Sequence, residues 1–328
     1  QLEPPPAGSG ATVTDQDSLI AVVSYEGLVP QYARGYFGQR DVHVGPEVTD
    51  LGLFNNVVGG TIDLDQVALR MRLENGFGAD IQISLNHLSA INTTAGSTVD
   101  LTHSIIPGPI NLNRAIDLGY GFTPGVYENE LDNSDSNLDV FLESLPDRLS
   151  YELDVRLNPL GDISNGNDFL YFESRLKASL ELEIPLRLIA NDLTLQNIVT
   201  PDLPGTAEAH GLRSGDLMLF ATNGFPFDAH LVLDIVNMDG QVLSNVPITG
   251  TITSGILGVN GLVQHATDSR MDAHLTTEQI NLLYADGRLR SRVAFTTADQ
   301  TQHLRILDSY ELELQITAAA NYIVNGDE

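Results

Sequence analysis

Two stretches of the chain, 148 residues apart, share one short pattern. The sequence L-E-N-G-F-G-A-D-I-Q-I-S-L begins at Leu73, and A-T-N-G-F-P-F-D-A-H-L-V-L begins at Ala221. Both stretches contain Asn-Gly-Phe, and both place an aspartate three residues after the phenylalanine. Similarity between distant segments is typical of a repeated structural unit. The chain is therefore expected to contain two copies of one module.

Two further matches follow in the same order along the chain. A strand-like run begins at Arg148-Leu149 and again at Arg288-Leu289, 140 residues later. The sequence L-K-A-S-L-E-L-E-I from Leu176 resembles Y-E-L-E-L-Q-I-T-A from Tyr310, 134 residues later. The shrinking distance indicates shorter loops in the second copy, because loops accept deletions more readily than strands. A length of 328 residues fits two such modules.

Within each copy, apolar and polar residues alternate with a period of two, as in Ile81, Ile83 and Leu85 and in residues 310–316. This period is typical of half-buried antiparallel strands. Helix signals are few. Ser136 or Asn137 is expected to cap a short helix, and Thr277 is expected to start its counterpart.

The predicted fold class is all-β, with two tandem antiparallel β-sandwich modules that each carry one short edge helix. Residues 1–20 are expected to form an extended linker, 21–200 the first module and 201–328 the second. Because Asn-Gly tolerates positive φ, Asn-Gly-Phe is interpreted as a turn that determines the fold. Gly59-Gly60, before a predicted strand from Thr61 to Leu64, is interpreted as a hairpin or a bulge.

The charge balance limits the classes of partner. Asp and Glu number 44 and Lys and Arg 16, which gives a net charge of −28. Such a surface repels the phosphates of nucleic acids and anionic lipid head groups. Lys177 is the single lysine, which indicates either a GC-rich genome that favours arginine codons or a halophilic protein whose carboxylates are screened by salt.

The chain has no cysteine, which excludes disulfides and thiolate sites within it, and no apolar run long enough for a transmembrane helix. It begins at Gln1, and residues 4–10 are rich in proline, glycine and serine. This start is interpreted as the linker that remains after removal of a signal peptide. The expected location is extracytoplasmic: periplasmic, associated with the outer membrane or on the cell surface.

No local motif indicates catalysis. The eight histidines include no pair spaced three to five residues apart, and there is no nucleophile elbow, dinucleotide fingerprint or P-loop. His230 is expected to face solvent. We therefore expect a protein that is not an enzyme and has no cofactor, although carboxylates on separate loops would leave no local signature of a hydrolase.

Two acidic loops are the remaining candidates for site chemistry, because calcium binds six to eight oxygen ligands from flexible loops. The alternative is that both loops are simply solvated in a very acidic protein. The candidate calcium ligands are Asp132, Asp135, Asp139, Asp162, Asn165 and Asp168.

Three segments resemble known exported proteins: residues 56–64, the strand after Asn75-Gly76-Phe77, and residues 180–186. They resemble envelope or secreted proteins of bacteroidete-type bacteria, mostly of unassigned function. The asparagine-glycine strand pair also resembles β-sandwiches of the water-stress, late-embryogenesis-abundant type. The resemblance implies an exported β-sandwich and carries no catalytic residues.

The first functional hypothesis is a structural protein of the envelope or cell surface, an accessory or scaffold subunit of a larger assembly such as an outer-membrane complex. Its partners would be other envelope proteins, bound by edge-strand pairing at residues 310–318 or through the N-terminal segment. The second is a protein that binds lipid or another apolar ligand between sheets or between modules. The third is a calcium-assisted carbohydrate-binding or adhesive module that uses exposed tyrosines: Tyr25, Tyr32, Tyr36, Tyr120 and Tyr127.

Overall fold

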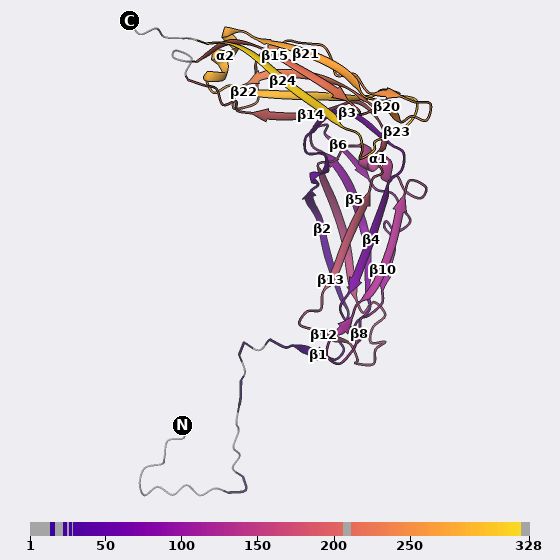
Figure 1. The fold of residues 1–328 in the computed structure, drawn as a ribbon. Helices are drawn as coiled ribbons and strands as arrows, with labels where there is room; N and C mark the ends of the chain where they lie inside the picture. Colours follow the sequence, from indigo (N-terminus) through magenta and orange to yellow (C-terminus); the bar gives the residue numbers. More distant parts are fainter. Residues whose placement is uncertain (1–13, 17–21, 25, 28, 206–210, 323–328) are drawn as a thin grey trace, which may run out of the picture.

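The structure, a computed structural model, describes residues 14–16, 22–24, 26–27, 29–205 and 211–322. Most of the expected N-terminal linker lies outside the described residues. Figure 1 shows two elongated sandwiches that meet near β3 and α1. The predicted all-β class is confirmed, because antiparallel sheets dominate both sandwiches and the two α-helices of the described residues are short.

The first sandwich packs two antiparallel sheets against each other. One sheet has the order β10-β4-β13, and the other has the order β2-β11-β5-β6 with β7 also paired to β5. Their bounds are β2 Arg40–Asp50, β4 Ala68–Asn75, β5 Ile81–Asn92, β6 Ser97–Asp100, β7 Pro109–Leu112, β10 Gly125–Asp132, β11 Arg148–Leu157 and β13 Leu176–Glu183.

The second sandwich repeats this plan. One sheet has the order β18-β21-β15-β24, and the other has the order β17-β16-β22-β14, with β3 and β23 both paired to β14. Their bounds are β3 Val57–Leu64, β14 Arg187–Val199, β15 Leu212–Asn223, β16 Phe227–Val236, β17 Val242–Val246, β18 Ile248–Thr249, β21 Thr267–Leu275, β22 Arg288–Thr297, β23 Leu304–Arg305 and β24 Leu312–Tyr322.

Three two-stranded ribbons and one short 3-10 helix complete the described elements. The ribbons pair β1 with β12, β8 with β9, and β19 with β20. Their bounds are β1 Tyr32–Arg34, β8 Ile116–Asp117, β9 Phe122–Thr123, β12 Phe169–Tyr171, β19 Ile256–Leu257 and β20 Val263–His265, with the 3-10 helix at Gly52–Phe54.

The strand orders match between the two sandwiches, as the internal duplication predicts. β4, β5, β10, β11 and β13 occupy the places of β15, β16, β21, β22 and β24. One detail of the sequence alignment is wrong. Leu176 is paired with Asn75, and the residue paired with Asn223 is Leu312. Leu176 therefore corresponds to Leu312 and not to Tyr310, and the two copies are offset by 136 residues at this strand.

The Asn-Gly-Phe turns have the same hydrogen bonds in both copies. Asn75 is fully buried; its Nδ2 donates to the backbone oxygens of Ala79 and Asn113 at 2.9 and 3.0 Å, and its Oδ1 accepts from the Phe77 N–H at 2.9 Å. Asn223 makes the same three bonds, to Phe227, Thr253 and Phe225, at 2.8, 3.0 and 2.9 Å. The turn is therefore held by a buried side chain.

The glycine of each turn allows the turn to pack closely against the backbone of a neighbouring segment. The expected positive φ is wrong here, since neither Gly76 nor Gly224 has a φ in the left-handed region. A Cβ on Gly76 would lie 2.8 Å from the backbone oxygen of Arg175, and a Cβ on Gly224 would lie 2.9 Å from that of Glu311. Each glycine N–H donates to that same oxygen. Only glycine lets the turn approach the neighbouring chain this closely.

Each sandwich has one short helix in the predicted place. α1 spans Leu138–Glu143 with Asn137 at the N-cap position. α2 spans Thr277–Tyr284 and thus starts at Thr277 as expected, with Thr276 as its N-cap. Thr276 forms a capping box with Gln279, in which each side chain bonds the other residue's backbone N–H. Both helices bury apolar residues at the end of a sandwich.

Strand β3 joins the two sandwiches. It lies between β2 and β4 in the chain, yet it pairs with β14 in the sheet of the second sandwich. Gly60 has a φ of +87° and faces Asp192, where the register of β14 shifts. The bulge expected at Gly59-Gly60 is therefore present in the strand pair.

The junction is packed. Leu64 of β3 and Ala190 of β14 are buried in one cluster with Leu138 and Phe141 of α1. The backbone N–H of Leu64 also donates to Glu143 at 2.8 Å. β14 pairs with β22 although it precedes the expected boundary after residue 200. That boundary stays a prediction.

Candidate functional site

The first acidic loop forms a turn that leads into α1. Asp132 Oδ1 accepts from the backbone N–H and hydroxyl of Ser134 at 2.7 and 2.6 Å, and these bonds lower the pKa of Asp132. Asp135 Oδ1 accepts from the Asp132 N–H at 3.0 Å, and Asp139 accepts from the Val140 N–H at 2.8 Å. The predicted ligands Asp132, Asp135 and Asp139 thus have local partners in the turn.

The second acidic loop contains both exposed and buried residues. Asp162 is exposed, and its Oδ1 accepts from Ser164 and from the Gly166 N–H at 3.1 and 2.8 Å. Asn165 has a φ of +54° in the same turn. Asp168 is buried, with 1% of its surface exposed.

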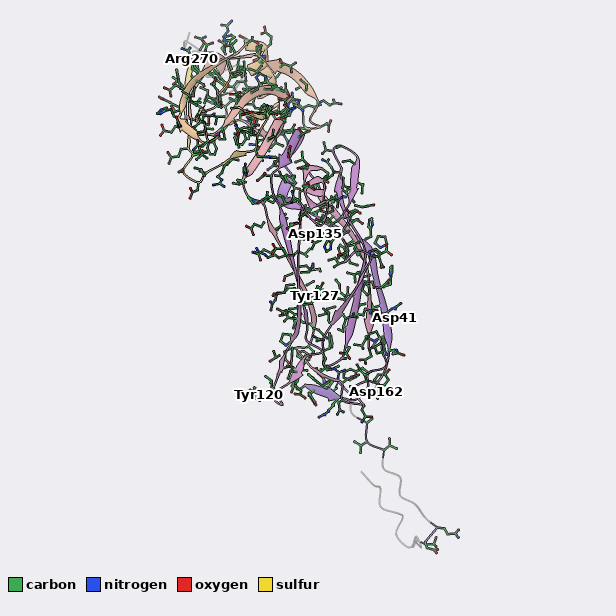
Figure 2. All side chains as sticks on the ribbon, turned by 90° about the vertical axis from the view of Figure 1, so that its right-hand side faces the viewer. Asp41, Tyr120, Tyr127, Asp135, Asp162 and Arg270 are labelled. Carbon is green, nitrogen blue, oxygen red and sulfur yellow. The ribbon has the colours of Figure 1, made fainter. Side chains whose placement is uncertain are left out.

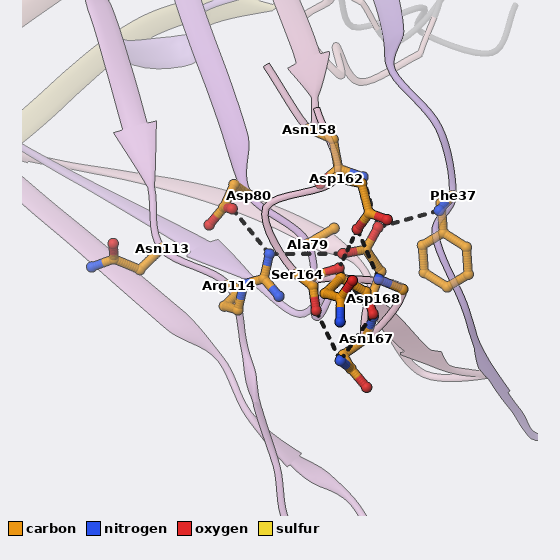
Figure 3. Close-up of polar contacts among 12 residues, drawn as sticks. Phe37, Ala79, Asp80, Asn113, Arg114, Asn158, Asp162, Ser164, Asn167 and Asp168 are labelled. Carbon is orange, nitrogen blue, oxygen red and sulfur yellow. Dashed lines mark hydrogen bonds and ion pairs between the residues drawn. The ribbon is translucent and has the colours of Figure 1, made fainter. Parts of the chain in front are cut away.

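Asp168 connects separate segments of the first sandwich through hydrogen bonds and an ion pair (Figure 3). Its Oδ2 accepts from Asn158 Nδ2 at 2.7 Å and from the Phe37 N–H at 3.2 Å, and Arg114 lies 3.7 Å from its Oδ1. Arg114 also binds Asp80 at 3.0 Å. Sequence reasoning missed this cluster because its members are far apart in the chain and carry no shared motif.

The two acidic loops lie apart. Figure 2 shows Asp162 at the end of the first sandwich that is remote from the second, and Asp135 nearer the second. Within residues 14–16, 22–24, 26–27, 29–205 and 211–322, no group of three His, Asp or Glu side chains could hold a metal ion. Calcium binding at these residues stays a prediction.

The second sandwich contains a buried ionic cluster that sequence reasoning also missed. Asp234 is fully buried and accepts from Arg290 at 2.6 Å, from Arg292 at 2.8 Å and from Asn245 at 2.6 Å. Burial opposes ionisation, but these donors outweigh it, and the pKa of Asp234 is lowered. The cluster links β16, β17 and β22.

Several histidines lie beside carboxylates, and His43 and His303 each lie within ion-pair distance of two. His43 Nδ1 lies 2.8 Å from Asp154, and the hydrogen bond from this carboxylate raises the pKa of His43 despite desolvation. His274 and His303 form similar exposed pairs with Asp216 and Asp63. His230 is exposed, as expected.

Of the five tyrosines predicted for a sugar platform, Tyr25 lies outside the described residues, and Tyr127 packs against a core cluster. Tyr120 is 88% exposed. The ring of Tyr32 lies beside that of Tyr171, with centroids 4.9 Å apart and planes tilted by 58°. Both tyrosine hydroxyls donate hydrogen bonds to Asp117. The hydrogen bond to Asp117 raises the pKa of Tyr171 to about 12. The predicted tyrosines therefore do not share one surface environment.

The strongest candidate for a site is the free side of β24, which we call the β24 edge. β24 pairs with β15 along its whole length, and no other strand of the described residues covers its second side. All eleven of its residues are exposed, including Leu314 and Ile316, which lie on its inward-facing side. Glu313 is its one charged residue.

Three other long edge strands among the described residues carry more charge. β13 has Lys177, Glu181 and Glu183, and β10 has Glu128, Glu130 and Asp132. β2 combines charges with Pro46. Charges and prolines block the addition of further strands, and a long apolar edge without them favours it. The β24 edge is therefore the longest edge of the described strands with a single charged residue; the shorter edge strand β3 also has one, Asp63.

Comparisons with known proteins give no family. No family model matches the chain, and no curated protein matches it. Among solved structures, it is similar to a Parabacteroides distasonis protein provisionally described as secreted, with 12% sequence identity and a TM-score of 0.35. The alignment covers 88% of this chain and 91% of that one. Among the described residues, no helix has the length and apolar character needed to cross a membrane.

Proposed function

We propose that this chain is a non-enzymatic interaction protein of the bacterial envelope or cell surface, an accessory or scaffold subunit of a larger assembly. The observation that carries the proposal is the β24 edge, which binds an extended strand of a partner protein. Its eleven residues offer a row of backbone donors and acceptors on one side and an apolar row directed inward. Strand addition uses these two features together.

The chain itself contains an example of strand addition. β3 leaves the first sandwich and extends the sheet of the second at β14. The β24 edge lies in the opposite sheet of the same sandwich and has no such added strand among the described residues. A partner strand there would extend that sheet in the same way.

Composition supports the extracytoplasmic setting of the proposal. The chain has no cysteine and a net charge of −28. The charge argues against partners with anionic surfaces, so a protein strand with neutral or basic residues suits the β24 edge best.

The test places a lysine at Ile316, whose side chain is inward-facing and 71% exposed. The matched control is Leu180→Lys, because Leu180 holds the equivalent position on β13 and is 56% exposed. Native envelopes from cells that produce each variant are crosslinked, and bound proteins are identified by mass spectrometry. We expect Ile316→Lys to lose a partner whose crosslinks map to residues 312–322, and Leu180→Lys to retain it. Recovery of the unmodified protein only as a free monomer would contradict the proposal.

A further inference from the structure

The second sandwich is incompletely filled at one end. Its two sheets enclose an open cavity of about 380 Å³. Six apolar residues form most of the wall: Leu193, Phe225, Phe227, Phe295, Ile306 and Leu312. The three phenylalanines are only half-buried although they face the interior of a sandwich. Protein interiors are normally close-packed, so an apolar space of this size indicates room for a ligand.

The wall has no free polar group for recognition. Asn223 is the polar side chain of the lining, and it is 3% exposed. Its Nδ2 donates to two backbone oxygens, of Phe227 and Thr253, and its Oδ1 accepts from the Phe225 N–H. A polar ligand would find no partner here, whereas apolar cavities bind apolar molecules.

The corresponding end of the first sandwich is filled. In that copy, Phe169 is 5% exposed and packs directly against Gly78. In the second copy, β23 pairs with β14 at Leu304, and Ile306 two residues later lines the open cavity.

The cavity continues as an apolar strip toward the surface. Leu193 and Leu312 line the cavity, and the next residues on the same faces of β14 and β24 are Leu195 and Leu314. Leu195 is 39% exposed and Leu314 is 54% exposed. An elongated apolar ligand would cover these residues as well as the cavity, whereas a compact one would leave them in water.

We propose that the second sandwich binds a hydrocarbon chain, with its end in the cavity and its length along the strip formed by Leu195 and Leu314. The head group lies in solvent and is uncharged or zwitterionic, because a protein of charge −28 repels anions. The site lies between two sheets of one sandwich. The cavity borders the junction between the two sandwiches, because Leu188 and Ala190 of β14 line it and also pack in the cluster that includes α1.

Binding is measured by the fluorescence of N-phenyl-1-naphthylamine, a neutral apolar probe, with purified full-length protein. We expect saturable binding that 1-hexadecanol displaces more strongly than palmitate does. Absence of saturable binding would overturn the proposal, and so would displacement by neither competitor. In a second arm, the protein is incubated with phosphatidylcholine vesicles, separated from them and extracted. Retained phospholipid would identify a membrane lipid as the source of the chain, and binding of hexadecanol alone would identify a free chain.

A matched pair of variants locates the ligand. Leu314→Glu puts a charge on the strip, and Gln315→Glu puts the same charge on the opposite face of the same strand. We expect Leu314→Glu to weaken probe binding about tenfold and Gln315→Glu to leave it unchanged, because only the first buries a charge beside the chain. Equal effects of the two variants would contradict the assignment.

A variant that fills the cavity distinguishes hydrocarbon binding in the cavity from partner binding at the β24 edge. Ala229 lines the cavity, is 5% exposed and does not belong to β24. We expect Ala229→Leu to lower probe affinity while the crosslinks at residues 312–322 persist. Should it fold poorly, as circular dichroism would reveal, the Leu314→Glu and Gln315→Glu pair decides. Unchanged probe affinity in a folded Ala229→Leu protein would overturn the proposal.

Discussion

At the scale of single residues, the two buried asparagines explain why one short motif survives in both copies. The side chains of Asn75 and Asn223 each make hydrogen bonds to three backbone groups. A buried backbone group without a partner costs free energy, so the position tolerates few replacements. The glycine that follows is fixed by a separate constraint, the close approach of a neighbouring carbonyl.

We expect Asn75→Ala and Asn223→Ala each to lower the free energy of unfolding by about 3 kcal/mol, because each leaves buried backbone groups unpaired. Asn→Asp at either position puts a carboxylate oxygen against the two backbone oxygens in a buried site, so we expect a loss at least as large. Urea unfolding followed by circular dichroism measures both series. A loss of less than about 1 kcal/mol for both alanine variants would show that the turn is not held by this side chain.

We expect Asp234 to make the free energy of unfolding depend on pH. Because its pKa is lowered on folding, its ionised form stabilises the protein above the ordinary value of 3.8, and this contribution is lost as the pH falls through the lowered pKa. We expect Asp234→Asn to be less stable at pH 7, since Arg290 and Arg292 lose their carboxylate. Its stability should also decline less steeply than that of the unmodified protein below pH 3.8. Parallel acid unfolding curves for the two proteins would contradict this role.

At the scale of elements, alternation along the chain predicted the strands, the repeated Asn-Gly-Phe pattern predicted the duplication, and cap residues predicted both helices. Alternation shows which face of a strand is buried and says nothing about which strand lies beside it. The transfer of β3 to the other sandwich was therefore not predicted. Buried ionic clusters such as the one around Asp234 were missed for the same reason, since their members come from separate strands.

Strand β14 provides a test of where the second sandwich begins. A fragment of residues 201–328 lacks β14, the strand that pairs with β22 over residues 193–199. We expect this fragment to unfold without cooperativity, and a fragment that begins at Pro185 to be more stable because it regains that pairing. Thermal unfolding monitored at far-ultraviolet wavelengths distinguishes them. Cooperative unfolding of residues 201–328 alone would support the sequence-based boundary instead.

At the scale of the whole molecule, β3 and the shared core cluster fasten two similar sandwiches at one end of each. This arrangement leaves the β24 edge accessible on the described part of the second sandwich (Figure 1). The first sandwich has charged residues on the equivalent strand, β13. The two copies thus differ at the strand where a partner strand would be added. Only the second copy offers a weakly charged edge there, so we expect one partner site per chain.

Hydrogen exchange at the β24 edge tests the central proposal most directly. The protein is compared as a purified monomer and in the assembly isolated from native envelopes, and exchange is followed in peptides that cover residues 312–322. We predict rapid exchange of part of these amides in the monomer, because only β15 covers the strand, and marked protection in the assembly. Equal exchange in both samples, with protection appearing on another surface, would show that the partner binds elsewhere.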